Sequence, residues 1–185
     1  MNFYSKLFCF TIAILITSSS AVAQNKFIHT KKFQKKIDRL GLFYYEPSEA
    51  WLHPVKPKRN DYGPFDLVLE SSDEHIAIMY RFKEVDEKNN LASQPQLDMY
   101  QYVATLASND LNKNITLTEI DHSVLDTVFN AEWGLYADFV PKQSLTTLPY
   151  CRMIAIYKSD HALIYSMVFY EDNIPEYFDL PISFQ

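Results

Sequence analysis

Glycine is scarce in this sequence, with three residues among 185, at Gly41, Gly63 and Gly134. Phosphate-binding loops and dinucleotide-binding turns need closely spaced glycines, because only a residue without a side chain lets the backbone approach a phosphate so closely. None of the three glycines stands in a Gly-x-Ser-x-Gly pattern, which marks the nucleophile of many hydrolases. The sequence therefore carries no signature of a nucleotide-binding enzyme or of a serine hydrolase.

Cysteine is almost absent, with Cys9 and Cys151 the two examples. Cys9 lies in an apolar N-terminal stretch, so cleavage of that stretch would leave Cys151 alone and exclude an internal disulfide. Cys151 stands in a strand-like run, 150–157, where a single cysteine usually behaves as a small buried apolar residue. We expect a domain that is stabilised by packing, with an unreactive, buried thiol.

Metal-binding spacing is also missing. The histidines are far apart, and none forms a His-x-x-x-His or His-Glu pattern that would place two ligands on one helix face. We therefore predict no metal site and no cofactor. The five histidines are His29, His53, His75, His122 and His161.

Positive charge is in deficit, with 17 Lys and Arg against 23 Asp and Glu and a formal net charge of −6. Binding to nucleic acid needs a net basic surface to neutralise phosphates, so we predict no nucleic-acid partner. Hydrophobic residues make up 48% of the chain and aromatic residues 15%, which is typical of an ordered globular domain rather than a disordered tail.

The N-terminus has the pattern of a secretory leader. Lys6 precedes a mainly apolar stretch, 7–16, and a small-residue tail then ends in Ala21-Val22-Ala23, the Ala-x-Ala pattern of signal-peptidase sites. This stretch is too short for a membrane span, which needs about 20 apolar residues. We predict that residues 1–23 are a signal peptide cleaved after Ala23, and that residues 24–185 form a single domain in the periplasm or outside the cell.

A short basic helix is predicted over residues 30–41. Phe33, Ile37 and Leu40 share one face, and Gly41 is a typical stop. The outward positions are mostly cations, which either form a solvated face or contact anionic lipid or another polyanion. The solvated face is the simpler interpretation. The cations are Lys31, Lys32, Lys35, Lys36 and Arg39.

The rest of the chain alternates strand-like runs with turns, apart from one long helix. We predict that this helix runs from Pro95 to Leu111, with Tyr100, Val103, Ala104, Ala107 and Leu111 on its inner face and Asn112 at its end. Residues 175–184 are predicted to form a short helical turn. The predicted strands are 42–46, 51–55 with Pro54 restricting it to an edge, 65–70, 75–82, 115–120, 129–140, and the hairpin 151–157 with 162–170.

Short turns between consecutive strands predict an α+β fold with a largely antiparallel sheet flanked by helices. The succession from Tyr45-Glu46-Pro47 and Trp51 through Arg81, one long helix and a run of strands to Ser183-Phe184 resembles the Mog1/PsbP-like α-β-α sandwich group, which includes small exported bacterial proteins. The resemblance implies a binding or accessory module rather than a catalyst. A cystatin-like or NTF2-like fold is the structural alternative.

Aromatic residues are the clearest surplus, and most of them suit the core of a sheet. We predict that Trp51, Arg81 and Trp133 line a groove for a protein, peptide or glycan partner, because aromatic and arginine side chains are frequent anchors at interfaces. Asn114-Ile115-Thr116 fits the glycosylation acceptor pattern, which matters only in a host that modifies such sites.

Two acid and imidazole pairs support an alternative. Asp121-His122 and Asp160-His161 lie at predicted turns, where folding could bring them together, with Asp138, as the site of a hydrolase-type enzyme. The sequence favours an exported, non-enzymatic binding or accessory domain over this enzyme. A third hypothesis is an envelope-surface protein that uses the basic helix over residues 30–41.

Overall fold

The computed structural model describes residues 31–44, 52–56, 62–85, 94–110, 112–172 and 182–185, and all structural statements below concern these residues. The predicted leader, Trp51 and the 175–181 part of the predicted C-terminal turn lie outside them.

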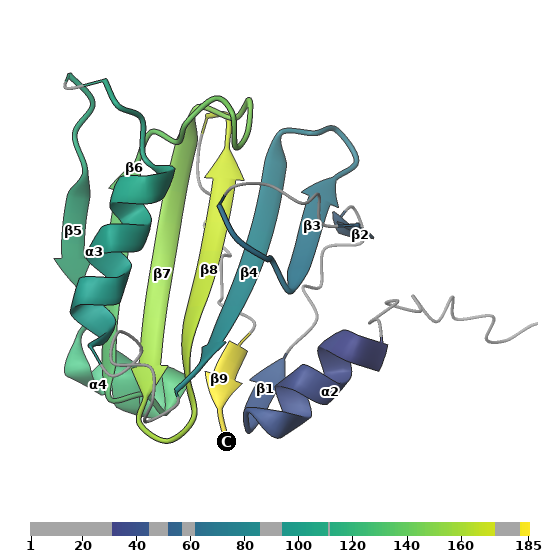
Figure 1. Ribbon diagram of the computed structural model, residues 1–185, viewed down its shortest axis with the longest axis vertical. Coiled ribbons are helices and arrows are strands. Elements are labelled where there is room, and N and C mark those ends of the chain that lie inside the picture. Colours follow the sequence, from purple (N-terminus) through teal and green to yellow (C-terminus); the bar gives the residue numbers. More distant parts are fainter. Residues whose placement is uncertain (1–30, 45–51, 57–61, 86–93, 111, 173–181) are drawn as a thin grey trace, which may run out of the picture.

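A seven-stranded antiparallel sheet, in the order β2-β3-β4-β8-β7-β6-β5, forms the centre of the molecule (Figure 1). The hairpin of β7 and β8 lies in the middle, as predicted from its apolar residues on both faces. Pro54, which lacks a backbone N–H, lies on edge strand β2, also as predicted. The strands are β2 (Leu52–Val55), β3 (Leu67–Ser71), β4 (Ile76–Glu84), β5 (Thr116–Glu119), β6 (Trp133–Phe139), β7 (Tyr150–Lys158) and β8 (Ala162–Tyr170).

One face of this sheet is covered by helix α3 (Pro95–Leu106), which crosses the β5, β6 and β7 side (Figure 1). Met99, Val103 and Leu106 of the helix pack on alternate strand residues such as Met153 and Met167. Cys151 belongs to the same cluster and is 1% exposed, so the predicted burial of its thiol is confirmed. Burial raises the pKa of this thiol well above its ordinary value, which keeps it protonated and unreactive.

Helix α3 differs from its prediction in length and in the face that it buries. It ends at Leu106, because Ala107 is extended and bridges to Pro141. Tyr100 is 47% exposed and Ala104 is also exposed, whereas Asp98 and Tyr102 point inward. The predicted inner face was therefore wrong at Tyr100 and Ala104, because Asp98 has buried partners on the sheet that an apolar periodicity does not reveal.

Separate pieces cover the opposite face. Helix α2 (Lys31–Arg39) packs beside a small sheet of β1 (Leu42–Tyr44) and β9 (Ile182–Phe184), and α4 (His122–Val124) continues into the π-turn η1 (Leu125–Phe129). Their apolar side chains meet one cluster on the large sheet, which includes Tyr80, Phe82 and Ile164. The α2 helix and its buried stripe of Phe33, Ile37 and Leu40 are as predicted.

Two further predictions on this face were wrong. Residues 182–184 form a strand instead of a helical turn, since β1 offers them a backbone partner, with Phe43 opposite Ser183. Residues 129–132 are not extended: Phe129 ends η1 and Asn130 takes a left-handed conformation with φ of 49°. Long-range pairing and a short π-turn leave little trace in local sequence. The α+β class itself, with a large antiparallel sheet flanked by helices, is confirmed.

Candidate functional site

Arg81, one of the predicted anchors, lies on β4 and faces the α3 side of the sheet. Its guanidinium carbon is 4.7 Å from the centre of the Tyr102 ring, and Nη1 donates a hydrogen bond of 3.2 Å to the carbonyl of Tyr62. A Cβ added to Gly63, where φ is 98°, would lie 2.8 Å from the same nitrogen. Arg81 is thus held by aromatic and backbone partners.

Trp133 lies on β6, opposite Tyr157 of β7, and packs partly buried against the cluster under α3. It shares a sheet face with Arg81, but β7 and β8 separate their strands. Three strand spacings correspond to roughly 14 Å between the two backbones. The structure does not bring these two residues side by side, and a groove that includes Trp51 stays a prediction.

The acid and imidazole pairs each have local partners. Asp121 caps α4, with Oδ1 accepting from the backbone N–H of Ser123 at 2.8 Å, and these hydrogen bonds lower the pKa of the carboxyl. The Nδ1 of His161 lies 3.0 Å from the carbonyl of Ser159, and its ring packs edge-on against Phe184. Asp138 binds Arg152 through two hydrogen bonds of 2.7 and 2.9 Å. The hydrolase hypothesis therefore gains no support from these contacts.

Within the described ranges, no group of three or more His, Cys, Asp and Glu residues is arranged to hold a metal ion. The same part of the chain contains no helix that is long and apolar enough to cross a membrane.

A buried ion pair lies under α3. Asp98 is 5% exposed, and its carboxylate accepts hydrogen bonds from Lys83 Nζ at 2.5 and 2.7 Å and from the Tyr165 hydroxyl at 2.7 Å. Burial, and then the negative charge of Asp98, raise the pKa of Tyr165 far above its ordinary value, so the hydroxyl remains a donor. This cluster joins α3 to β4 and β8, and its contacts are those of a structural link.

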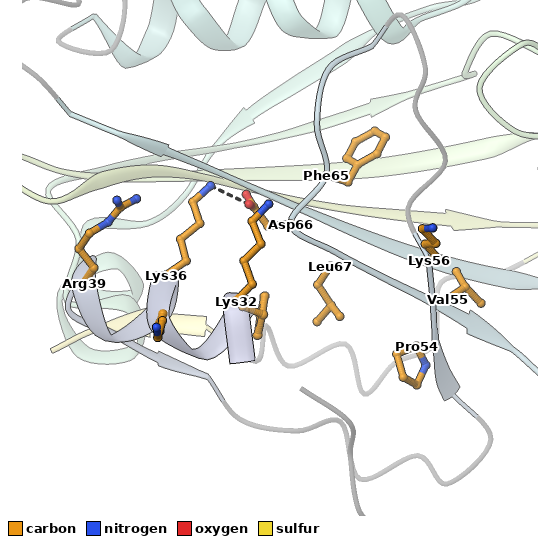
Figure 2. A pocket seen from close by; sticks show the side chains of 11 residues that line it. Lys32, Lys36, Arg39, Pro54, Val55, Lys56, Phe65, Asp66 and Leu67 are labelled. Carbon is orange, nitrogen blue, oxygen red and sulfur yellow. Dashed lines mark hydrogen bonds and ion pairs between the residues drawn. The ribbon is translucent and has the colours of Figure 1, made fainter. Parts of the chain in front are cut away.

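A groove of about 930 Å³ lies between α2 and the β2–β3 edge of the sheet (Figure 2). The α2 helix forms one wall, and the end of β2 forms the other. Leu67 lies between the two walls at the start of β3, and Phe65, two residues earlier, lines the groove from the cluster under α3. The lining residues are Lys32, Phe33, Lys35, Lys36, Arg39, Pro54, Val55, Lys56, Phe65, Asp66 and Leu67.

Asp66 holds the α2 wall of this groove to the sheet. Its carboxylate accepts hydrogen bonds from Lys36 Nζ at 2.7 Å and from the backbone N–H of Phe82 at 2.8 Å. Lys36 also donates to the carbonyl of Phe82 at 3.0 Å. One carboxylate thus ties α2 to β3 and β4 and holds the groove wall in place.

The remaining groove cations differ in whether they form an ion pair. Arg39 forms an exposed ion pair of 3.1 Å with Glu84. Lys32, Lys35 and Lys56 are exposed and form no ion pair with a described residue. Four of the five cations predicted for the basic helix line the groove, and Lys31 does not.

Sequence reasoning found the cationic face of α2 but missed the groove that it borders. Lys56 follows the predicted strand 51–55, and Phe65 and Leu67 belong to the predicted strand 65–70. The charge-rich run that follows Pro54 was the available signal, because it adds cations immediately after an edge strand. Nothing local, however, places that edge opposite α2.

The groove, rather than the predicted aromatic set, is the feature on which a function can be built. Its floor is apolar and its rim is cationic. Asp66, which accepts a hydrogen bond from Lys36, ties the α2 wall to the sheet. The chain matches no protein-family model, and no curated protein matches it significantly in sequence.

Proposed function

We propose that this chain is an exported, non-enzymatic binding domain that holds an anionic ligand in the groove between α2 and β2–β3. The observation that carries the proposal is the gathering of five cationic side chains and one carboxylate around a concave apolar floor. That carboxylate, Asp66, is already neutralised by Lys36. Arg39 is paired with Glu84, and Lys32, Lys35 and Lys56 have no ion-pair partner among the described residues. The groove therefore carries a local excess of positive charge although the whole chain has a net charge of −6.

Such a contrast favours recognition of anions. Clefts lined by one sign of charge concentrate counter-ions and raise association rates, and this effect falls as salt screens the charges. A volume of about 930 Å³ lies within the usual range of small-ligand sites. The ligand is thus expected to be a small anion or part of a larger one.

Two other uses of this region fit less well. An extended peptide adding to β2 would meet Pro54, which lacks a backbone donor at this edge. Insertion of α2 into a membrane would need an apolar face, but Phe33, Ile37 and Leu40 are 2–3% exposed in the core. Any contact of α2 with a membrane surface would then be electrostatic.

Export rests on the leader pattern of residues 1–23. Sequencing the N-terminus of protein purified from its native cells is expected to start at Gln24. A native chain that begins at Met1 and fractionates with cytosolic proteins would contradict this part of the proposal and leave the anion site untouched.

The anion site is tested with a double variant, Lys32→Glu with Lys56→Glu, which reverses one charge on each wall. The probes are tripolyphosphate and dodecyl phosphate, titrated at low salt with the binding position mapped by NMR chemical shifts. We expect at least one probe to bind in the groove, and its affinity to fall about tenfold or more, because each charge contact contributes up to about 1 kcal/mol and reversal adds repulsion.

The matched control is Lys31→Glu with Lys113→Glu. Both lysines are exposed, neither lines the groove, and the change in net charge is the same. Equal loss of binding in both variants would indicate attraction to the whole protein, and the proposed site would then be wrong.

A further inference from the structure

We infer that the ligand of this groove is a single amphiphilic anion, with one phosphate, carboxylate or sulfonate group and an aliphatic or aromatic body. This inference rests on the proposed function and narrows it from anions in general to one chemical class. It follows from how charge and apolar surface are distributed along the groove.

The groove cations without an ion-pair partner among the described residues lie on both of its walls. On α2, Lys36 is bound to Asp66 and Arg39 is paired with Glu84. Lys32 and Lys35 remain on this wall, and Lys56 lies on the opposite one (Figure 2). A compact anionic group on the α2 wall would meet the ammonium donors of Lys32 and Lys35, which lie one turn apart, and Lys56 would attract it from the opposite wall.

The same distribution disfavours a long polyanion. A polymer with regularly spaced negative groups needs an uninterrupted row of free cations. Along α2 that row is interrupted where Asp66 and Glu84 have already taken Lys36 and Arg39. A polymer passing along the helix would place its charges beside two carboxylates.

Apolar surface lies directly beside the free cations. Pro54 is exposed and Val55 half-buried on the β2 wall, and Leu67 forms the floor between that wall and α2 (Figure 2). An inorganic anion would leave this surface in water, whereas the hydrocarbon body of an amphiphile would cover it. Each buried CH₂ group contributes to binding, so the tail should set the affinity.

The geometry also favours a monomeric ligand over a lipid in a bilayer. The apolar residues lie in the concavity between two walls, and α2 presents no apolar face outward. A lipid would have to leave the plane of its membrane to reach Leu67. A free amphiphile in solution meets no such obstacle.

The closing experiment compares dodecyl phosphate, kept below its critical micelle concentration, with inorganic phosphate, tripolyphosphate and phosphatidylglycerol vesicles. We expect dodecyl phosphate to bind at least tenfold more tightly than either inorganic anion. Lys32→Glu with Lys56→Glu should weaken it at least tenfold, and Lys31→Glu with Lys113→Glu should leave it within twofold.

A second variant tests the apolar part of the β2 wall. Val55→Thr keeps the shape of the side chain and makes it polar, so it should weaken dodecyl phosphate severalfold and leave tripolyphosphate unchanged. Thermal unfolding of each variant confirms that the domain is folded during the titration.

Each other outcome has a defined meaning. If an inorganic anion binds in the groove as tightly as dodecyl phosphate, the amphiphile inference is overturned and the anion site stands. If vesicles bind and dodecyl phosphate does not, a membrane surface replaces the free amphiphile. If no anion binds in the groove, both the inference and the proposed site are wrong.

Discussion

The two faces of the large sheet differ in where their charged side chains lie and in how many of them are paired. Under α3, charges are buried and paired: Asp98 accepts from Lys83 and Tyr165, and the helix lies close to the sheet. On the other face, α2 keeps Lys32 and Lys35 at the surface beside a groove. Each face uses a paired carboxylate to fix its helix, Asp98 under α3 and Asp66 under α2, and the α2 face in addition keeps Lys32 and Lys35 at the surface.

The difference follows from how each face is covered. The α3 face is covered by one helix, and Asp98 of that helix is buried against the sheet. The opposite face is covered by α2, the β1–β9 pair and the α4–η1 turn, and α2 does not reach the β2 edge closely enough to exclude solvent. A groove forms at the gap that these pieces leave. The Asp98 cluster and the proposed binding groove thus lie on different faces, and each can be tested separately.

The largest effect is expected from Asp98→Asn, which breaks the buried pair and leaves the Lys83 ammonium without its carboxylate. Removal of one partner of a fully buried ion pair typically lowers the free energy of unfolding by about 3–5 kcal/mol. Lys83 keeps 24% of its side chain exposed, so we expect a loss of about 2–4 kcal/mol. Urea denaturation measures the change. Asp126→Asn, an exposed acid on η1, is the matched control and should change stability by less than about 0.5 kcal/mol.

A smaller loss is expected where η1 lies against the sheet. A Cβ on Gly134 would come within 2.6 Å of Leu125 Cδ2 and 2.9 Å of Ile120 Cδ1. Gly134→Ala should therefore lower the free energy of unfolding by about 1–3 kcal/mol through overpacking. If η1 packs on the sheet more loosely than α3 does, the loss of unfolding free energy will be near zero. Repeating the substitution in a Leu125→Ala background should reduce its cost.

Tyr165→Phe removes one donor from Asp98 and tests the α3 face at alkaline pH. We expect a loss of about 1–3 kcal/mol at neutral pH, since a buried acceptor loses a partner. Folding raises the pKa of Tyr165 above its ordinary value of 10.0, so the stability from this raised pKa is complete below that pH and declines as pH rises above it.

The wild-type free energy of unfolding should therefore fall more steeply above pH 10 than that of Tyr165→Phe. Tyr150→Phe, at a side chain that is 46% exposed, is the control and should keep the wild-type slope. Identical slopes in all three proteins would mean that Tyr165 ionises as readily in the folded state as in the unfolded one.

The smallest change in stability is expected at the groove. Lys32→Glu with Lys56→Glu should alter the free energy of unfolding by less than about 0.5 kcal/mol, because both side chains are exposed and without an ion-pair partner among the described residues. Anion binding should fall in the same variant. A loss of several kcal/mol on urea denaturation would show that these lysines support the fold, and the contrast between the faces would fail.

Much of the fold could be predicted from local patterns. Apolar residues on both faces of the 151–157 and 162–170 runs indicated a central hairpin, and Pro54 indicated an edge. Helix α3 was predicted with a partly wrong inner face, because its periodicity was counted on apolar residues alone. Asp98 has its partners on β4 and β8, far away in sequence, and no local rule identifies such a buried acid.

The candidate site was predictable only in part. The cationic side of α2 is visible in the sequence, since five cations share the outer positions of one short helix. Its opposite wall is not, because Pro54, Val55 and Lys56 come next to α2 only through the packing of a different strand edge. Local rules describe single elements, and a groove lies between two of them.

By itself, the sequence determined the α+β class, the antiparallel pairing of neighbouring strands and the net negative charge, because these depend on composition, periodicity and turns. The tertiary structure alone decided which charges are buried, which are neutralised and which remain free. Pairing depends on distance: Lys36 comes within reach of Asp66, and Lys83 within reach of Asp98, only when the elements pack. Packing also makes Lys32 and the end of β2 line the same groove.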